Sequence, residues 1–593
     1  MGKRNRILAL LAAFFTVTVF SLRLELYQGI DENKLLTIFN KLYNSFSSNA
    51  LLEVVAIIGL FFFYDKWLKK EKGFDIFTAI ISFALSFSFI LATFYSKYNA
   101  SDYMWGNIFQ VVMTVVTLLG FSLFIYALLR MILLRESKEI PKQKDSFLEK
   151  HIFIVSAVVI FTFWMIWVIG NYPGSINPDS ILQLKYFRGE EPWSNWHPPL
   201  SSILMGVCFS VGNKIKDANF GFFLYCLFQT ITGSLIFAFA LKKLKDFGVS
   251  VRALILALLY ICLVPIFGCY AQWFEKDFLY TQVVVLFLTF MLCIYTKKTC
   301  EKKDLCGLIL SALFCIFLRN NGIYAVIPSL IALLIWIKKE EKKHVAIALI
   351  TAFASFVLIV KVMFPIIGVS ATSVSESLGV MFQQTARYAV EYPGEIDDYE
   401  KEVLDKNFQG MEHLYNYDPR INDPVKIYYN HSDFKGYLKV WLHQFTKHPG
   451  VYFESFFNGT YGYLAPVEND IGAWVQREYF DYQIELGAFH PTDNMVNKSL
   501  VWAWNLSQKL PILRFLTMPG LYTWITIVCA WYVLKRKQAS KLILMIPAFI
   551  NILVCMASPL ALAMRYALPT LACSLILLLY VFKNDEGKNA YFN

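Results

Sequence analysis

The sequence predicts an all-α, multi-pass membrane protein with about 14 transmembrane helices and an external, mainly helical domain. Two observations support this fold class. First, the chain of 593 residues is 57% hydrophobic with a mean hydropathy of +0.48, which is too apolar for a soluble globular protein of this size. Second, the apolar residues fall into blocks of roughly 17–25 residues, the length that crosses a hydrocarbon core as a helix. Backbone polar groups in lipid must find partners within their own segment, so we expect these blocks to be helical.

The expected spans form three groups, before residue 145, between 146 and 367, and after 518. In order they cover residues 6–22, 50–64, 75–95, 107–134, 152–170, 218–241, 252–268, 278–296, 304–318, 322–337, 345–367, 519–534, 541–559 and 566–583. This even number of spans places both termini on one side of the membrane. Lysine clusters such as 242–245 and 338–343 fall on the same side, and because Lys and Arg gather in cytoplasmic loops, we expect that side to be the cytoplasm.

The apolar block from Pro198 to Val211 is too short to fit this pattern. If it crossed the membrane, every later basic cluster would lie on the opposite side. We therefore expect residues 171–217 to form one external segment whose apolar parts lie along the membrane as juxtamembrane helices. This assignment places Asp179 and His197 outside the cytoplasm.

Four domains follow from these spans. They are an accessory bundle at 1–145, a transmembrane core at 146–367 that includes the loop 171–217, an external domain at 368–518 and C-terminal transmembrane helices at 519–593. The external segment contains 12 Lys+Arg and 19 Asp+Glu, a net charge of −7 in a chain whose net charge is +11. That difference in sign supports the orientation. Within the segment, the sequence favours helices near 395–408 and 433–447.

Several function classes are disfavoured by the sequence. The 11 cysteines lie in apolar blocks or at their edges, without a CxxC pair or a Cys/His cluster, so we expect neither a disulfide framework nor a structural zinc site. The sequence has no P-loop, no G-x-G-x-x-G and no G-x-S-x-G elbow. The positive charge belongs to cytoplasmic loops, so we expect the lipid bilayer, not nucleic acid, as its environment.

The most informative stretch joins Asn177-Pro-Asp-Ser180 to Trp196-His-Pro-Pro-Leu200 in the first external loop. Asp179 stands at an expected helix start, where it is either the N-cap of that helix or a reactive carboxylate. His197 precedes a helix that begins at proline. It either hydrogen-bonds the backbone or has an active-site role, binding substrate phosphate or orienting Asp179. Trp193 and Trp196 fit an interface belt more readily than a platform for sugar rings.

Two arginines lie at the external ends of expected spans, where the charge rule disfavours them. Arg319 is followed by Asn320, and Arg565 is followed by Tyr566. A cation in such a place has a partner or a function. A guanidinium suits a phosphate because it offers two parallel donors, but an ion pair with Glu275 or Asp277 explains the arginines equally well.

Acidic groups gather at the next external corner, in Glu275-Lys-Asp277. They could support a base, bind a divalent cation, or cap the following span. Two carboxylates without further ligands are a weak metal signal, so we assign no metal ligands, although a divalent cation remains possible. Arg387 begins soon after a span and could therefore face the same cleft.

An acidic external loop, juxtamembrane helices and a His-Pro-Pro-Leu motif together resemble the GT-C superfamily of polyprenyl-phosphate-sugar-dependent glycosyltransferases. The protein O-mannosyltransferase branch carries a similar motif, and the arrangement with Leu318-Arg-Asn-Asn-Gly322 and Arg565-Tyr566 is similar to a group of bacterial membrane proteins of that superfamily. The resemblance covers residues 152–367 most closely. Two features depart from it: Asp179 stands alone where protein mannosyltransferases have two adjacent acids, and four spans precede the core.

This resemblance implies an inverting sugar transfer on the external face of a bacterial cytoplasmic membrane. Asp179 would be the general base, and Arg319, Arg565 and His197 would stabilise the departing phosphate. The donor would be a polyprenyl-phosphate-linked sugar, and the acceptor a cell-wall glycan, a lipid or a protein, with no cofactor required. The alternatives are a flippase-like or polymerase-like carrier of lipid-linked glycan and a non-enzymatic assembly factor.

Overall fold

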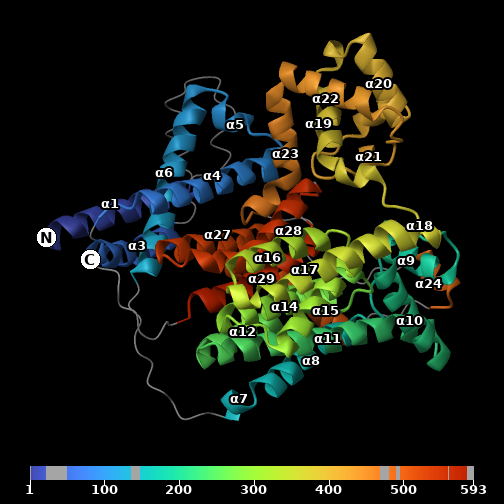
Figure 1. Cartoon of the computed structure of the whole chain (residues 1–593). Coiled ribbons are helices and arrows are strands. Elements are labelled where there is room, and N and C mark those ends of the chain that lie inside the picture. Colours follow the sequence, from blue (N-terminus) through green and yellow to red (C-terminus); the bar gives the residue numbers. More distant parts are fainter. Residues whose placement is uncertain are drawn as a thin grey trace. The chain divides into compact units, whose positions relative to one another are not determined.

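A computed structural model of the chain describes residues 2–21, 50–71, 73–134, 147–467, 480–488, 494–558, 560–561 and 563–583. It is 81% helical, and within these ranges it contains isolated β-bridges but no strand. The all-α fold class is therefore confirmed. Figure 1 shows the helices in chain order.

The helices form two compact units, and each contains two separate stretches of the chain. Unit 1 consists of residues 1–138 and 380–469, and unit 2 of residues 139–379 and 470–593. The first boundary lies close to the expected one at 145. The expected external segment 368–518, in contrast, is divided between the two units.

Unit 1 begins with helices α1 (Gly2–Ser21), α3 (Ala50–Lys70), α4 (Ile76–Tyr98), α5 (Asp102–Trp105) and α6 (Ile108–Leu133). Asp75 caps α4 by accepting from the Thr78 backbone N–H at 3.1 Å. Arg130, near the end of α6, pairs with Glu71 at 2.6 Å and with Asp75 at 3.0 Å. These charged groups therefore tie the ends of three helices together.

The second part of unit 1 follows as α19 (Gly379–Glu391), α20 (Asp398–Phe408), α21 (Asp423–Lys426), α22 (Phe434–Lys447) and α23 (Pro449–Leu464). Helices α20 and α22 confirm the two helices expected from sequence. Helix α23 packs against α4, and its Glu454 accepts from the Ser101 backbone N–H at 3.1 Å. Arg420 also donates to the Ser96 carbonyl at 3.2 Å. These long-range contacts explain why residues 380–469 join the N-terminal helices.

Unit 2 is a larger helical bundle. Its main helices are α8 (Ile152–Gly170), α9 (Pro178–Arg188), α10 (Pro199–Ile215), α11 (Ala218–Asp246), α12 (Val251–Leu263), α13 (Pro265–Ala271), α14 (Lys276–Lys297), α15 (Lys302–Leu318), α16 (Gly322–Trp336), α17 (Lys342–Phe356), α18 (Phe364–Ile366), α25 (Met495–Lys509), α27 (Pro519–Lys535), α28 (Ile546–Ala557) and α29 (Met564–Val581). Shorter pieces are α7 (Phe147–Lys150), α24 (Asp481–Glu485) and α26 (Pro511–Phe515). Helix α14 lies at the centre of the bundle and packs against α11, α15 and α29. In its apolar segment of 18 residues, 89% is buried.

Eight helices among the described residues are long and apolar enough to cross a membrane, or nine if the pair α12 and α13, bent by 51°, is one span. The eight helices coincide with eight of the expected spans, and the pair α12 and α13 coincides with a ninth, 252–268. The expected spans near 6–22, 50–64, 304–318, 322–337 and 519–534 also form helices, α1, α3, α15, α16 and α27, but these do not meet the same criterion. The apolar helices support a membrane protein.

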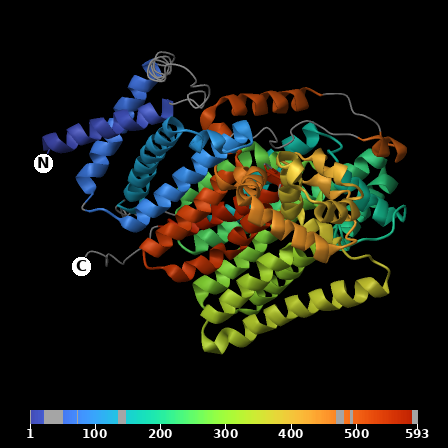
Figure 2. The ribbon, with the colours of Figure 1, turned by 90° about the horizontal axis from the view of Figure 1, so that it is seen from above.

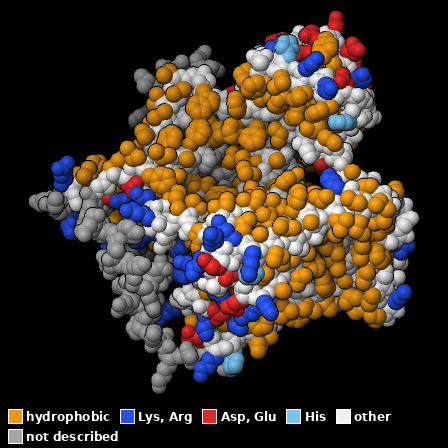
Figure 3. Space-filling view, in the orientation of Figure 1, with side chains coloured by type: hydrophobic (Ala, Val, Ile, Leu, Met, Phe, Trp, Pro, Cys, Tyr) orange, Lys and Arg blue, Asp and Glu red, His pale blue; other side chains and the backbone are white. Residues whose placement is uncertain are grey.

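The stretch from Lys339 to Ile366 contains α17 and α18. Its apolar segment of 18 residues has a mean hydropathy of 2.5, and only 17% of that segment is buried. In Figure 2 this helix runs along one edge of its bundle. Figure 3 shows hydrophobic side chains covering the surface over α17 and α18. An apolar helix so exposed fits contact with lipid.

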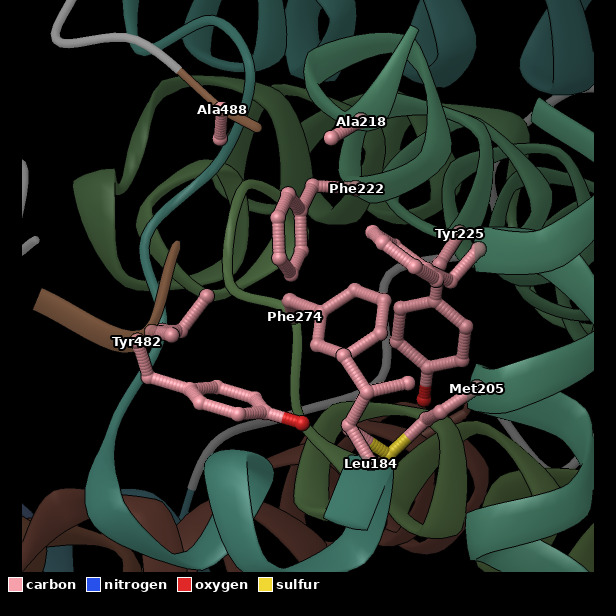
Figure 4. Close-up of a cluster of buried hydrophobic side chains, with 10 residues drawn as sticks. Leu184, Met205, Ala218, Phe222, Tyr225, Phe274, Tyr482 and Ala488 are labelled. Atoms are coloured by element: carbon pink, nitrogen blue, oxygen red, sulfur yellow. The ribbon is translucent and has the colours of Figure 1, made fainter. Parts of the chain in front are cut away.

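Helices α9 and α10 rest on a buried apolar cluster within unit 2. Figure 4 shows its main members, and the full set is Ile176, Leu184, Met205, Phe209, Ala218, Phe222, Tyr225, Phe274, Tyr482 and Ala488. The cluster joins α9, α10 and α11 to the loop before α14. Because buried side chains interdigitate closely, this packing fixes the start of α9 against that loop.

Candidate functional site

The start of α9 places Asp179 by local capping. Asn177 is the N-cap, and its Oδ1 accepts from the Ser180 backbone N–H at 2.8 Å, while Pro178 occupies the first helical position. Proline there has the backbone angle that a helix needs. Asp179 is therefore not the cap, and its carboxylate is free for other contacts in the first turn.

The segment before α9 is joined to the segment before α14 by a short parallel bridge between Ser175 and Trp273. The Ser175 backbone N–H donates to the Gln272 carbonyl at 3.1 Å, and the Phe274 N–H donates to the Ser175 carbonyl at 2.8 Å. The Asn177 amide then donates to Glu275 Oε2 at 3.1 Å. The Asn-Pro-Asp and Glu-Lys-Asp motifs, nearly one hundred positions apart, thus become neighbours.

The histidine loop is held by backbone contacts with the segment that follows α18. The Asn195 N–H donates to the Ser370 carbonyl at 2.8 Å, and the Ser370 N–H donates to the Trp193 carbonyl at 2.9 Å. Asn320 donates from its amide to the Asn195 carbonyl at 2.6 Å. Asn320 therefore binds the loop that carries His197, and it gains a positioning role that its place in the sequence did not specify.

Two ion pairs define the centre of the site. Arg565 Nη1 lies 3.1 Å from Asp179 Oδ2, and Arg319 Nη1 lies 3.2 Å from Asp277 Oδ1. Both guanidiniums lie against the ring of Tyr566, with Cζ 4.8 Å from its centroid for Arg565 and 4.7 Å for Arg319. Arg565 also donates to the Tyr566 hydroxyl at 2.9 Å. The cation–π contacts and ion pairs fix both arginines near one point.

Lys276, which we did not select from sequence, completes the cluster. Its Nζ lies 3.3 Å from Nδ1 of His197. His197, Glu275, Lys276 and Asp277 are buried, whereas the side chain of Asp179 remains 35% exposed. The accessible carboxylate is therefore the one that the resemblance implied as base.

The charges around Asp179 determine its protonation. Burial alone would raise the pKa of Asp179, but Arg565 and Lys276 outweigh that effect and hold the pKa well below its ordinary value. Asp179 is consequently ionised at neutral pH. As long as Arg565 is paired with it, the carboxylate is also a weak base.

The two neighbouring titratable groups, His197 and Glu275, have pKa values shifted in favour of their neutral forms. Burial and the Lys276 ammonium lower the pKa of His197 to about 3, so its imidazole is neutral. Burial and the Asp277 carboxylate raise the pKa of Glu275 above its ordinary range. If Glu275 is protonated, three cations face two carboxylates, and the cluster has an excess positive charge suited to an anion.

The two tryptophans lie at the edge of this cluster. Trp196 is 46% exposed and stacks on His197, with ring centroids 5.4 Å apart. The ring centroid of Trp193 lies 6.1 Å from that of Tyr186. Arg387 belongs to unit 1, where its guanidinium pairs with Glu391 at 2.7 Å and Glu454 at 3.6 Å. Those ion pairs account for its charge without a ligand.

Groups with metal-ligand geometry lie elsewhere in the part of the chain that the structure describes. They are Cys300, Glu341 and His344, and Asp397, Glu400 and His443. Neither group includes Asp179, Glu275 or Asp277. In each group the carboxylate already accepts from the histidine, at 3.0 Å for Glu341 and 2.8 Å for Glu400.

A family model described as "Family of unknown function (DUF6020)" matches residues 188–591, more than half of the chain. The chain belongs to the DUF6020 family. The matched region includes His197, Lys276, Arg319 and Arg565, whereas Asp179 lies just before it. Comparisons with curated proteins and with solved structures found no match. The function of this DUF6020 protein therefore has to be argued from its site.

Proposed function

We propose that this protein is an inverting glycosyltransferase that moves a sugar from a polyprenyl-phosphate donor to an envelope acceptor. The observation that carries the proposal is the contact between Arg565 and Asp179, at 3.1 Å, beside Arg319, Lys276 and His197. A transferase of this kind needs a carboxylate to accept a proton and cations to stabilise a phosphate leaving group. Both requirements are met within one cluster.

In the proposed step, an acceptor hydroxyl attacks the anomeric carbon from the face opposite the phosphate. Its proton passes to Asp179, a new C–O bond forms, and the bond between the anomeric carbon and the phosphate oxygen breaks. The electron pair of that bond leaves with the polyprenyl phosphate, whose added charge is stabilised by Arg565 and Arg319. Attack from the opposite face inverts the anomeric configuration.

The ion pair also gives a reason for ordered binding. With Arg565 on Asp179, the lowered pKa makes the carboxylate a poor proton acceptor. A donor phosphate that draws Arg565 away would let the pKa of Asp179 rise towards its ordinary value. Donor binding would thus activate the base, and the acceptor would react only after the donor is in place.

The topology belongs to the proposal as well. We propose about 14 spans, a GT-C-like core and an active site on the external face of a bacterial cytoplasmic membrane. A lipid-linked donor fits this arrangement because its sugar stays at the membrane surface, where juxtamembrane helices such as α9 and α10 would lie. The acceptor is an envelope glycan, lipid or protein that carries a free hydroxyl.

The test compares the envelope glycans of cells with and without this protein by mass spectrometry, after restoring the wild type, Asp179→Asn or Glu191→Gln. Glu191 is an exposed carboxylate of the same loop and serves as the matched control. We expect one sugar residue to be lost without the protein and in Asp179→Asn, and to return with Glu191→Gln. Full restoration by Asp179→Asn would favour a carrier of lipid-linked glycan, because a carrier abstracts no proton.

A further inference from the structure

His197 has one ring nitrogen with a partner and one without. Its Nδ1 lies 3.3 Å from Lys276 Nζ, and its Nε2 is buried without a hydrogen-bond partner among the described residues. The whole residue is only 5% exposed. Buried polar atoms in native proteins are nearly always hydrogen-bonded, so an unpartnered nitrogen here indicates a group that a ligand would satisfy.

The partner of Nδ1 decides which nitrogen carries the proton. A neutral imidazole has one donor and one acceptor, whereas a lysine ammonium has only donors. If Lys276 donates, Nδ1 must be the acceptor, and the proton lies on Nε2. The acidic side chains that share this cluster with Lys276 are Asp179, Glu275 and Asp277.

The other groups around His197 agree with a neutral ring. Burial disfavours an imidazolium most strongly and Lys276 comes next; together with a smaller effect of Arg565 they outweigh Asp179 and Asp277, which favour it. The rings of Trp196 and Tyr186 lie against the imidazole, at 5.4 and 6.5 Å between centroids. Among the described residues, neither ring forms a hydrogen bond with Nε2.

We propose that Lys276 is a positioning residue that holds His197 in the tautomer protonated on Nε2, and that this N–H donates to a phosphate oxygen of the donor lipid. The identity of the ligand rests on the proposed function, whereas the tautomer does not. A phosphate oxygen suits this position because it only accepts, and because Arg319 and Arg565 supply cations to the same cluster.

The tautomer can be measured directly on the full chain in detergent. Nitrogen-15 NMR of histidine-labelled protein separates protonated from unprotonated ring nitrogens, and His197→Gln identifies the signals of His197 among the eight histidines. We expect protonated Nε2 and unprotonated Nδ1 in the wild type and in Lys185→Met, a control that removes a lysine from α9. Lys276→Met should shift His197 towards the other tautomer. A His197 protonated on Nδ1 in the wild type, or unchanged by Lys276→Met, would overturn the proposal.

Binding of undecaprenyl phosphate, used as the probe, tests the second half. We expect Lys276→Met and His197→Gln each to weaken binding about tenfold, as for loss of one hydrogen bond to a charged group. Because Lys276→Met removes the His197 contact as well as one cation of the cluster, the double variant should bind no more weakly than Lys276→Met alone. Equal binding by wild type and Lys276→Met would overturn the phosphate contact.

The two readouts distinguish failure of the inference from failure of the proposed function. If the wild type does not bind undecaprenyl phosphate but its His197 tautomer depends on Lys276, the transferase proposal and the phosphate contact fail while the tautomer assignment holds. If the probe binds with the expected affinity pattern for His197→Gln but not for Lys276→Met, the transferase proposal survives and the role of Lys276 does not.

Discussion

Arg565 Nη1 lies 3.1 Å from Asp179 Oδ2, and this contact joins residues 386 positions apart. It connects the first turn of α9 with the first turn of α29. The same arginine donates to Tyr566, whose ring also contacts Arg319. The Tyr566 ring therefore contacts both guanidiniums, and one of them, that of Arg565, is paired with the accessible carboxylate of Asp179.

Removal of the Arg565 charge should change the protonation of Asp179. In Arg565→Gln we expect the pKa of Asp179 to rise, because burial remains while the strongest neighbouring cation is gone. Infrared difference spectroscopy of the carboxyl band across a pH series would measure it, with Asp179→Asn to identify the band. An unchanged pKa in Arg565→Gln would show that the ion pair does not control this carboxylate.

The ion pair between Arg319 and Asp277 should contribute mainly to the stability of the fold. Arg319→Ala leaves Asp277, which is 2% exposed, without its cation, and we expect a loss of about 3–5 kcal/mol in the free energy of unfolding. Thermal unfolding followed by circular dichroism would measure the decrease, and the double variant Arg319→Ala/Asp277→Asn should recover part of it. The exposed pair Arg188–Glu190 gives the matched control, where Arg188→Ala should cost less than about 1 kcal/mol. Equal losses at both arginines would contradict the buried pairing.

The titration of His197 should contribute to the pH dependence of the free energy of unfolding. Its pKa is about 3 in the folded protein, against an ordinary value of 6.5, so the unfolded chain binds more protons between these limits. The free energy of unfolding therefore decreases as the pH falls from 6.5 towards 3. Thermal midpoints at pH 7, 6, 5 and 4 should fall less steeply for His197→Gln than for the wild type. Parallel curves would mean that His197 titrates alike in both states.

Gly322 should tolerate no side chain. A Cβ there would lie 1.9 Å from the backbone carbonyl oxygen of Cys315, which cannot move aside as a flexible side chain would. Since the glycine starts α16 only three residues after Arg319 and two after Asn320, Gly322→Ala should displace both. We expect a loss of about 1–3 kcal/mol in stability, measured by thermal unfolding. Gly59→Ala, where nothing lies within 4 Å, is the control and should be neutral or slightly stabilising. A neutral Gly322→Ala would refute this packing.

The sequence predicted what depends on local chemistry. Pro178 and Pro199 indicated the starts of α9 and α10, and the apolar blocks indicated most helices of unit 2. An ion pair between Arg319 and Asp277 was one of two equal interpretations. The partner of Arg565 was not foreseen, because a pairing across 386 positions follows from the tertiary fold and not from a local pattern.

Lys276 was missed although a signal for it existed. It is a cation at the start of an expected span, as Arg319 and Arg565 are cations at span ends, and the same charge rule would have selected it. The sequence contains no comparable pattern that indicates the division of residues 368–518 between two units. That division depends on contacts such as that of Glu454 with Ser101, which join helices remote in sequence.

The most direct measurement of the central claim is the release of polyprenyl phosphate from a polyprenyl-phosphate sugar by the purified protein with an envelope acceptor. We predict release by the wild type and by Glu191→Gln, and a decrease of at least a hundredfold in Asp179→Asn. Asp179→Asn should nevertheless bind the donor at least as tightly as the wild type, because Arg565 no longer has to leave a carboxylate. Unchanged release by Asp179→Asn would contradict the account.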